Sequence, residues 1–99
     1  MFVALERLLS LDEGYRRVFQ VQERSLLLMV VRGRTQLLEN RCPRQGASLH
    51  NATLAGTVLR CARHGVEFDL ASGCALNAPS ADLVQLPLAY DAERVGIDL

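Results

Sequence analysis

The sequence has no hydrophobic run long enough to cross a membrane, and it has no net charge. The longest strongly apolar stretch, residues 26–31, lies between Arg24 and Arg32, whereas a transmembrane helix needs about 18 apolar residues or more. Eleven basic and eleven acidic residues cancel. The bulk charge therefore gives no reason to expect nucleic acid or an anionic membrane surface as a partner.

The sequence also has few cysteines and lacks the pattern of a secretion signal. Residues 1–11 contain Glu6 and Arg7 and show no basic start followed by an apolar core. Three cysteines in a chain without such a signal fit a reducing compartment, where thiols serve chemistry rather than disulfides. We therefore expect a soluble, cytoplasmic protein.

Length and composition are those of one folded domain. The chain has 99 residues, of which 49% are hydrophobic and 22% charged. These values are ordinary for a globular protein and exclude a disordered chain. A chain of this length closes one core and is too short for a second, so we expect a single domain, residues 1–99.

Short apolar runs separated by turn signals predict an all-β fold. The expected strands are residues 15–21, 25–31, 35–39, 57–60, 66–70, 83–86 and 94–99. A polar break at residues 22–24 and Gly33 in the next break predict hairpins. Residues 5–11 fit either a short helix or a strand-to-loop crossover. Residues 40–54 and 77–80 are expected to be loops. We find no internal repeat. Many short strands at close spacing favour a small antiparallel β-sandwich or barrel.

Two cysteine-bearing loops carry the chemistry. The first runs Cys-Pro-Arg from Cys42, and the second runs Cys-Ala-Arg-His from Cys61, with residues 45–60 between them. Each is followed by a glycine, Gly46 or Gly65, which would let the backbone fold tightly around a cofactor and aim its amides at sulfur. Pro43 fixes its own φ and suits a rigid turn beside a ligand.

Residues 42–49 and 61–70 together resemble the signature of the Rieske [2Fe–2S] family, which is Cys-x-His, a spacer of about this length, and Cys-x-x-His. The resemblance extends over nearly the whole chain. In this family two cysteines hold one iron and two histidines hold the other. The resemblance implies that Cys42 and Cys61 are thiolate ligands and that His64 is an imidazole ligand. It also implies an antiparallel β domain that binds the cluster with two loops at its tip.

Arg44 stands where the first-loop histidine of the family belongs. A protonated guanidinium has five donors and no free lone pair, so it is a poor metal ligand. We predict a [2Fe–2S] cluster of partial, labile occupancy, with a site that holds no cluster as the alternative. His50 is expected at the surface and is the first candidate for the missing bond, and Cys74 is expected to be an ordinary thiol outside the site.

The resemblance implies an electron carrier that passes single electrons from a reductase to an oxygenase or related redox enzyme. Such a protein has no substrate pocket and is not itself an enzyme. Two alternatives stay open. One is a cluster-free subunit or docking module of a larger reductase, like the small subunit of assimilatory nitrite reductases. The other is a mononuclear metal site at Cys42, Cys61 and His64, where zinc would fit the ligand types.

Overall fold

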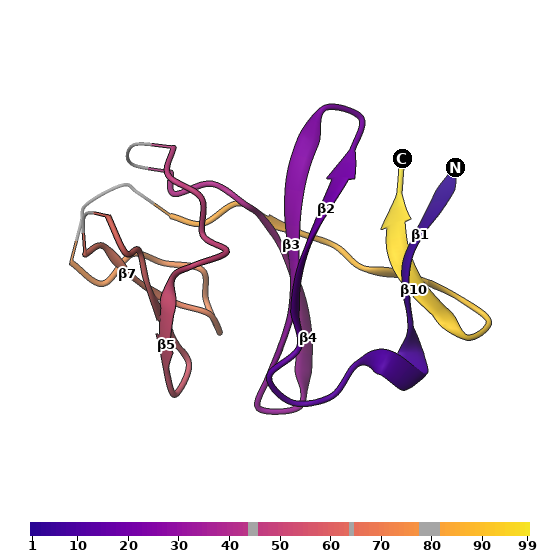
Figure 1. Ribbon diagram of the computed structural model, residues 1–99, viewed down its shortest axis with the longest axis horizontal. Coiled ribbons are helices and arrows are strands. Elements are labelled where there is room, and N and C mark those ends of the chain that lie inside the picture. The colour runs from indigo at the N-terminus through magenta and orange to yellow at the C-terminus, as the bar shows by residue number, and fades with distance from the viewer. Residues whose placement is uncertain (44–45, 64, 78–81) are drawn as a thin grey trace.

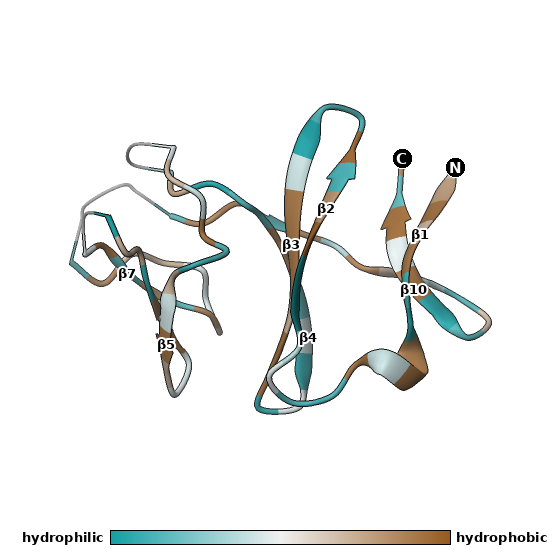
Figure 2. Ribbon diagram, in the orientation of Figure 1, coloured by the Kyte–Doolittle hydropathy of each residue, from teal (hydrophilic) through white to brown (hydrophobic). Residues whose placement is uncertain are grey.

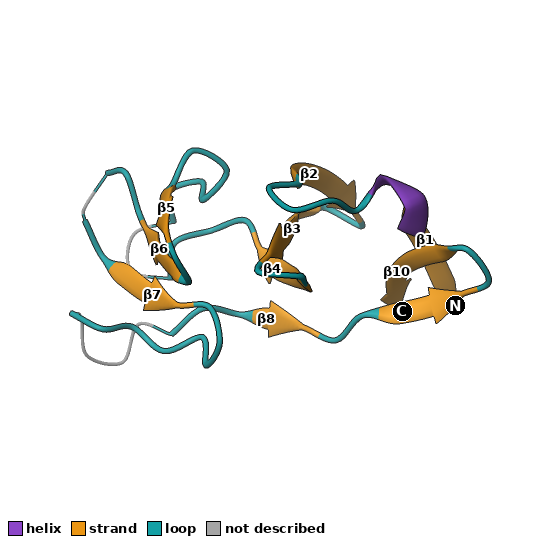
Figure 3. Cartoon of the chain, turned by 90° about the horizontal axis from the view of Figure 1, so that it is seen from below, coloured by secondary structure: helices purple, strands orange, loops and turns teal. Residues whose placement is uncertain are grey.

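The computed structural model describes residues 1–43, 46–63, 65–77 and 82–99, and its strands form three small antiparallel sheets in a row (Figures 1 and 3). The terminal sheet has the order β1-β10-β9, the central sheet β2-β3-β4-β8, and the loop sheet β5-β6-β7. Within the described ranges, no helix is long and apolar enough to cross a membrane.

The described residues form ten strands, which make up the three sheets, and one short 3-10 helix. The terminal sheet contains β1 (Phe2–Arg7), β9 (Ala89–Asp91) and β10 (Arg94–Asp98). The central sheet contains β2 (Arg16–Val21), β3 (Arg24–Val31), β4 (Arg34–Glu39) and β8 (Gln85–Leu86). The loop sheet contains β5 (Thr53–Ala55), β6 (Val58–Arg60) and β7 (Glu67–Asp69), and the 3-10 helix is Leu8–Ser10.

The central sheet is covered on both faces, which explains the apolar run in β3. Successive side chains of a strand point to opposite faces. Accordingly, Leu27, Met29 and Val31 pack in a cluster with the loop sheet, whereas Leu26 and Leu28 pack in a second cluster with the terminal sheet. Figure 2 shows β3 coloured as hydrophobic over most of its length. All six residues from 26 to 31 are buried. At about 2 kcal/mol for each side chain, their burial stabilises the fold by on the order of 10 kcal/mol.

Two-residue turns close both hairpins of the central sheet. Gln22 and Glu23 have φ values of 48° and 67°, and Arg32 and Gly33 have values of 52° and 75°. Positive φ at both central residues matches the right-handed twist of the flanking strands. The carboxylate of Glu13 stabilises the second turn by accepting hydrogen bonds from the backbone N–H groups of Arg32 and Gly33, at 2.7 and 2.8 Å. These bonds lower the pKa of the Glu13 carboxyl.

The expected all-β antiparallel class is confirmed, and the seven expected strands correspond to β2, β3, β4, β6, β7, β8 and β10. Three strands were not predicted: β1, β5 and β9. All three residues of β5 are exposed, so they show no alternation, and β1 and β9 are edge strands on β10. The two alternatives for residues 5–11 each hold in part, because β1 ends at Arg7 and the 3-10 helix follows. The expected loop at 40–54 is shorter than predicted because β5 begins at Thr53.

A hydrogen bond between side chains ties the terminal sheet to the start of the central sheet. The hydroxyl of Tyr15 donates to Glu6 Oε2 at 2.7 Å. Partial burial of the phenol and the nearby carboxylate raise the pKa of Tyr15 to about 12. The pKa of Glu6 is lowered, first by the backbone N–H of Arg7 and then by Tyr15.

We predict that Tyr15→Phe lowers the free energy of unfolding at neutral pH by about 1 kcal/mol, since it removes one charge-assisted hydrogen bond of a half-buried group. In the unmodified protein this contribution is complete below pH of about 10, the pKa of an unfolded tyrosine, and is lost as the pH rises towards about 12. Urea unfolding at stepwise pH checks both statements. The exposed Tyr90 offers the control Tyr90→Phe, and equal effects of the two substitutions would contradict the prediction.

Candidate metal centre

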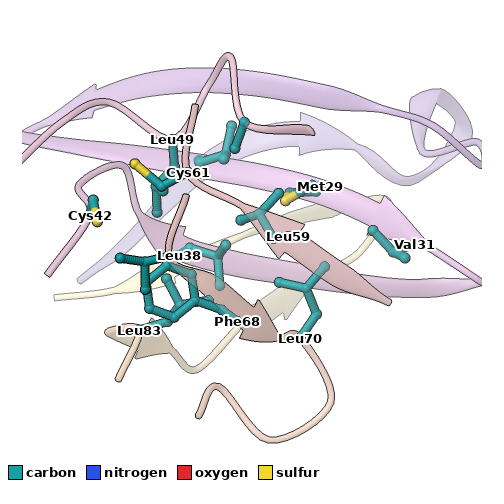
Figure 4. Packing of buried hydrophobic residues seen from close by; sticks show 13 residues of the cluster. Met29, Val31, Leu38, Cys42, Leu49, Leu59, Cys61, Phe68, Leu70 and Leu83 are labelled. Carbon is teal, nitrogen blue, oxygen red and sulfur yellow. The ribbon is translucent and has the colours of Figure 1, made fainter. Parts of the chain in front are cut away.

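Cys42 and Cys61 meet in the core between the central and loop sheets. Cys61 directly follows β6, and Cys42 lies just beyond the end of β4. Both side chains are buried and belong to one cluster with Leu38, Leu49 and Phe68. Figure 4 places the two cysteines at the same end of this cluster. The structure therefore brings together the two thiols that the sequence singled out.

The two cysteine loops have the same backbone hydrogen bonds. In the first, the Cys42 N–H donates to the carbonyl of Ala47 at 2.7 Å, and the Gly46 N–H donates to the carbonyl of Cys42 at 2.7 Å. In the second, the corresponding bonds join Cys61 to Val66 and Gly65 to Cys61, both at 2.9 Å. Each cysteine thus begins a turn that is closed four residues later by a glycine.

Each of these glycines has a left-handed backbone, with φ of +75° at Gly46 and +68° at Gly65. An arginine also lies across each glycine. A Cβ on Gly46 would come within 3.4 Å of Arg41 Nε, and a Cβ on Gly65 within 3.2 Å of Arg60 Nη2. Any other residue would be strained at this φ. The added Cβ would make an ordinary contact at Gly46 and a tight one at Gly65, where the guanidinium would have to shift slightly. The positive φ is therefore the reason for glycine that both loops share.

The sequence contains the same correspondence, which corrects the expectation of no internal repeat. Residues 41–47 are Arg-Cys-Pro-Arg-Gln-Gly-Ala, and residues 60–66 are Arg-Cys-Ala-Arg-His-Gly-Val. The two segments align without a gap and share both arginines, the cysteine and the glycine. In this alignment Arg44 corresponds to Arg63, and Gln45 corresponds to His64.

Two asparagines, which the sequence analysis did not identify, hold the loops closed. Asn40 Oδ1 accepts the backbone N–H of the buried Leu49 at 2.9 Å. Asn77 Oδ1 accepts the N–H of Glu67 at 2.8 Å, and its Nδ2 donates to the carbonyl of Gly65 at 3.0 Å. Asparagine side chains commonly satisfy backbone groups in loops in this way, but Asn77 lies twelve residues from Gly65 in the sequence, so no local signal marked its contact.

Arg16 fixes the far end of the first loop to the central sheet. Its Nη1 donates to the carbonyls of His50 and Ala52, at 3.0 and 2.6 Å. His50 is exposed, in agreement with the expectation of a surface histidine. Cys74 is exposed as well and lies outside the cluster that holds Cys42 and Cys61. Its exclusion from the ligand set stays a prediction.

Arg44, His64 and part of the expected loop at residues 77–80 lie outside the described residues, so the roles of Arg44 and His64 as ligand positions stay predictions. Among the residues that are described, no group of three His, Cys, Asp or Glu side chains forms a metal site. The described donors are two cysteine thiols on two equivalent loops. This donor set fits the cysteine-ligated iron of a [2Fe–2S] cluster.

An antiparallel β fold that carries two cysteine loops at one end of its core fits a small iron–sulfur type of domain. Comparison with protein families agrees: the Rieske [2Fe–2S] domain model matches residues 1–87. The chain belongs to this family, and membership implies a [2Fe–2S] cluster as cofactor.

Three similar proteins are ferredoxins. The chain is 30% identical over 93 residues to the ferredoxin component of a naphthalene 1,2-dioxygenase system from Pseudomonas aeruginosa, covering 93% of this chain and 89% of that protein. It is 32% identical over 87 residues to the ferredoxin component of an alkene monooxygenase system from Xanthobacter autotrophicus, covering 87% and 71%. The structure of a ferredoxin from Sphingomonas yanoikuyae B1 has a TM-score of 0.83 at 26% identity, covering 100% of this chain and 99% of that one.

We predict that Asn40→Ala loosens the first cysteine loop, because the buried N–H of Leu49 loses its acceptor. The expected results are amide exchange of Leu49 that is faster by on the order of tenfold and a loss of about 1–2 kcal/mol in the free energy of unfolding. Asn40→Asp keeps an acceptor oxygen and should preserve the slow exchange. Hydrogen exchange followed by NMR measures both variants, and an unchanged Leu49 rate in Asn40→Ala would show that this bond does not hold the loop.

Proposed function

We propose that this chain is a ferredoxin of the Rieske type whose [2Fe–2S] cluster is held by Cys42 and Cys61 on one iron and by His64 on the other. The observation that carries the proposal is the pair of buried cysteines on two equivalent, glycine-closed loops at one end of the core. The family match and the ferredoxin relatives support it.

The residues of the chain have separate tasks in this role. When bound, the cluster takes up and releases one electron at a time. Cys42 and Cys61 supply the thiolates, and the turn hydrogen bonds hold them in place, so that little rearrangement accompanies a change of charge. Phe68 and Leu49 are fully buried beside the cysteines and exclude water from the inner side. Ala62 is exposed, so the short path for an electron runs out through the loops.

The partners follow from the relatives, which are ferredoxin components of oxygenase systems. We propose that the chain receives electrons from a reductase and delivers them to an oxygenase, and that it acts as a single domain of residues 1–99 with no substrate pocket of its own. A cytoplasmic location stays a prediction from the sequence.

Anaerobically purified protein should contain iron and acid-labile sulfide in equal amounts and show visible absorption that bleaches on one-electron reduction. Cys42→Ala and Cys61→Ala should abolish all three signals, because each removes a thiolate that no other group replaces. Cys74→Ala is the matched control and should retain them. Iron-free, sulfide-free protein would favour the cluster-free docking module, and zinc without sulfide would favour the mononuclear site.

We further predict that Arg44→His raises cluster occupancy and slows cluster loss in air by on the order of tenfold, since an imidazole donates a lone pair that a guanidinium lacks. Arg44→Gln is the matched control, because it removes the guanidinium without supplying an imidazole, and it should give no gain. Iron, sulfide and absorbance are compared after identical reconstitution. Equal occupancy in Arg44→His and the unmodified protein would contradict the prediction, and His50→Ala would then test whether His50 supplies the bond.

A further inference from the structure

Positive charge is concentrated around the two cysteine loops although the chain as a whole is neutral. Residues 40–66 contain four arginines and no aspartate or glutamate. Residues 67–99 contain six acidic residues and one arginine. All eleven basic residues of the chain are arginines. The neutral total therefore conceals a polarised molecule.

Three of these arginines are described by the structure, and all three are exposed: Arg41 and Arg63 belong to the cysteine loops, and Arg60 ends β6 beside the second loop. Arg41 and Arg60 immediately precede the cysteines and lie across Gly46 and Gly65. Arg63 follows in the second loop. The ion pairs within the described ranges are Met1–Asp98, Arg17–Glu6 and Arg24–Glu39, so none of them neutralises a loop arginine.

The acidic groups nearest the second loop leave this charge largely uncompensated. Glu67 lies opposite Arg60 in the pairing of β6 with β7. Asp69 is at the other end of β7, where its carboxylate accepts hydrogen bonds from Ala71 and Ser72. The carboxylate of Asp82 accepts the backbone N–H of Ala75 at 3.1 Å. Glu67 is therefore the acidic residue beside Arg60 and Arg63, whereas Arg41 shares a surface hollow with Glu23 and Glu39.

A surface hollow lies between two of these arginines. It is lined by Arg60 and Arg63 together with Thr53, Cys61, Ala62 and Gly65. Guanidinium groups bind carboxylates through paired N–H donors, with directional preference as well as charge. Because Arg60 already rests against Gly65, part of its side-chain freedom is lost before a partner arrives, which reduces the entropic cost of binding.

We propose that the surface around Arg60 and Arg63 is the docking site for an acidic patch on a redox partner protein, with a partner carboxylate seated in the hollow between these two arginines. The inference rests on the proposed function for the identity of the partner as a redox protein. It adds the sign of the partner's charge and the residues that recognise it. Docking here brings the partner to the cysteine loops, where the path for an electron is shortest.

The charge distribution favours an acidic protein over nucleic acid. Outside residues 40–66 the chain carries a net charge of −4, which would repel a long polyanion that extended beyond the loops. For a compact acidic partner the same polarity is favourable, since it turns the cysteine end of this chain toward the partner as the two proteins approach. A small charged surface also suits the weak, transient complexes that electron carriers form.

The test is the binding of a fluorescein-labelled oligoglutamate peptide, followed by fluorescence anisotropy at low salt. We expect Arg60→Gln and Arg63→Gln each to weaken binding by about two- to fivefold. Arg94→Gln removes an exposed arginine from the terminal sheet and should change the affinity by less than either. Arg63→Lys keeps the charge but not the planar fork, so it should fall between Arg63→Gln and the unmodified protein. Raising the salt to about 0.2 M should weaken binding further.

Equal effects of Arg60→Gln, Arg63→Gln and Arg94→Gln would overturn the proposal, as would tighter binding of a duplex DNA oligonucleotide than of oligoglutamate at the same salt. Circular dichroism spectra that match the unmodified protein would show that the loop variants are folded. Iron and sulfide are measured on the same samples. Their absence from the unmodified protein would count against the proposed electron carrier, whereas the pattern of peptide affinities tests the docking surface by itself.

Discussion

Six consecutive apolar side chains of β3 are buried because the central sheet is covered on both faces. One face packs against the terminal sheet, and the other packs against the loop sheet that carries Cys61. This double burial sets the position of the loop sheet, and with it the meeting of the two cysteines. A polar substitution in β3 would separate the layers and remove the support on which the metal centre depends.

The candidate metal centre consists of two equivalent cysteine turns, and packing in the hydrophobic core places these turns at the same end of the fold. Each copy consists of an arginine, a cysteine and a glycine with positive φ, closed by the same pair of backbone hydrogen bonds. Asn40 and Asn77 then anchor the copies to their surroundings. This division is compatible with an arginine at position 44 of the sequence, since the shared hydrogen bonds and glycine φ do not require a histidine there.

The positive charge of the arginines is positioned by the same two turns that carry the cysteines. The arginines that precede the cysteines cover the glycines that close the turns, so the geometry of the turns also fixes where positive charge is presented. The resulting polarity links the proposed site of electron transfer to the proposed site of docking. Substitutions at exposed Arg63 should separate the two roles, because this residue contributes charge without covering a turn glycine.

The sequence by itself determined the features that depend on neighbouring residues. The central-sheet hairpins, the glycine-closed cysteine loops and the family resemblance follow from local backbone preferences and spacing. The tertiary structure alone decided which edges pair and which distant groups meet. Strands β1, β5 and β9 form because partners stand beside them, although their own patterns are weak. The contacts of Asn40, Asn77 and Arg16 were likewise not predictable, since they join segments whose proximity is set by packing rather than by sequence separation.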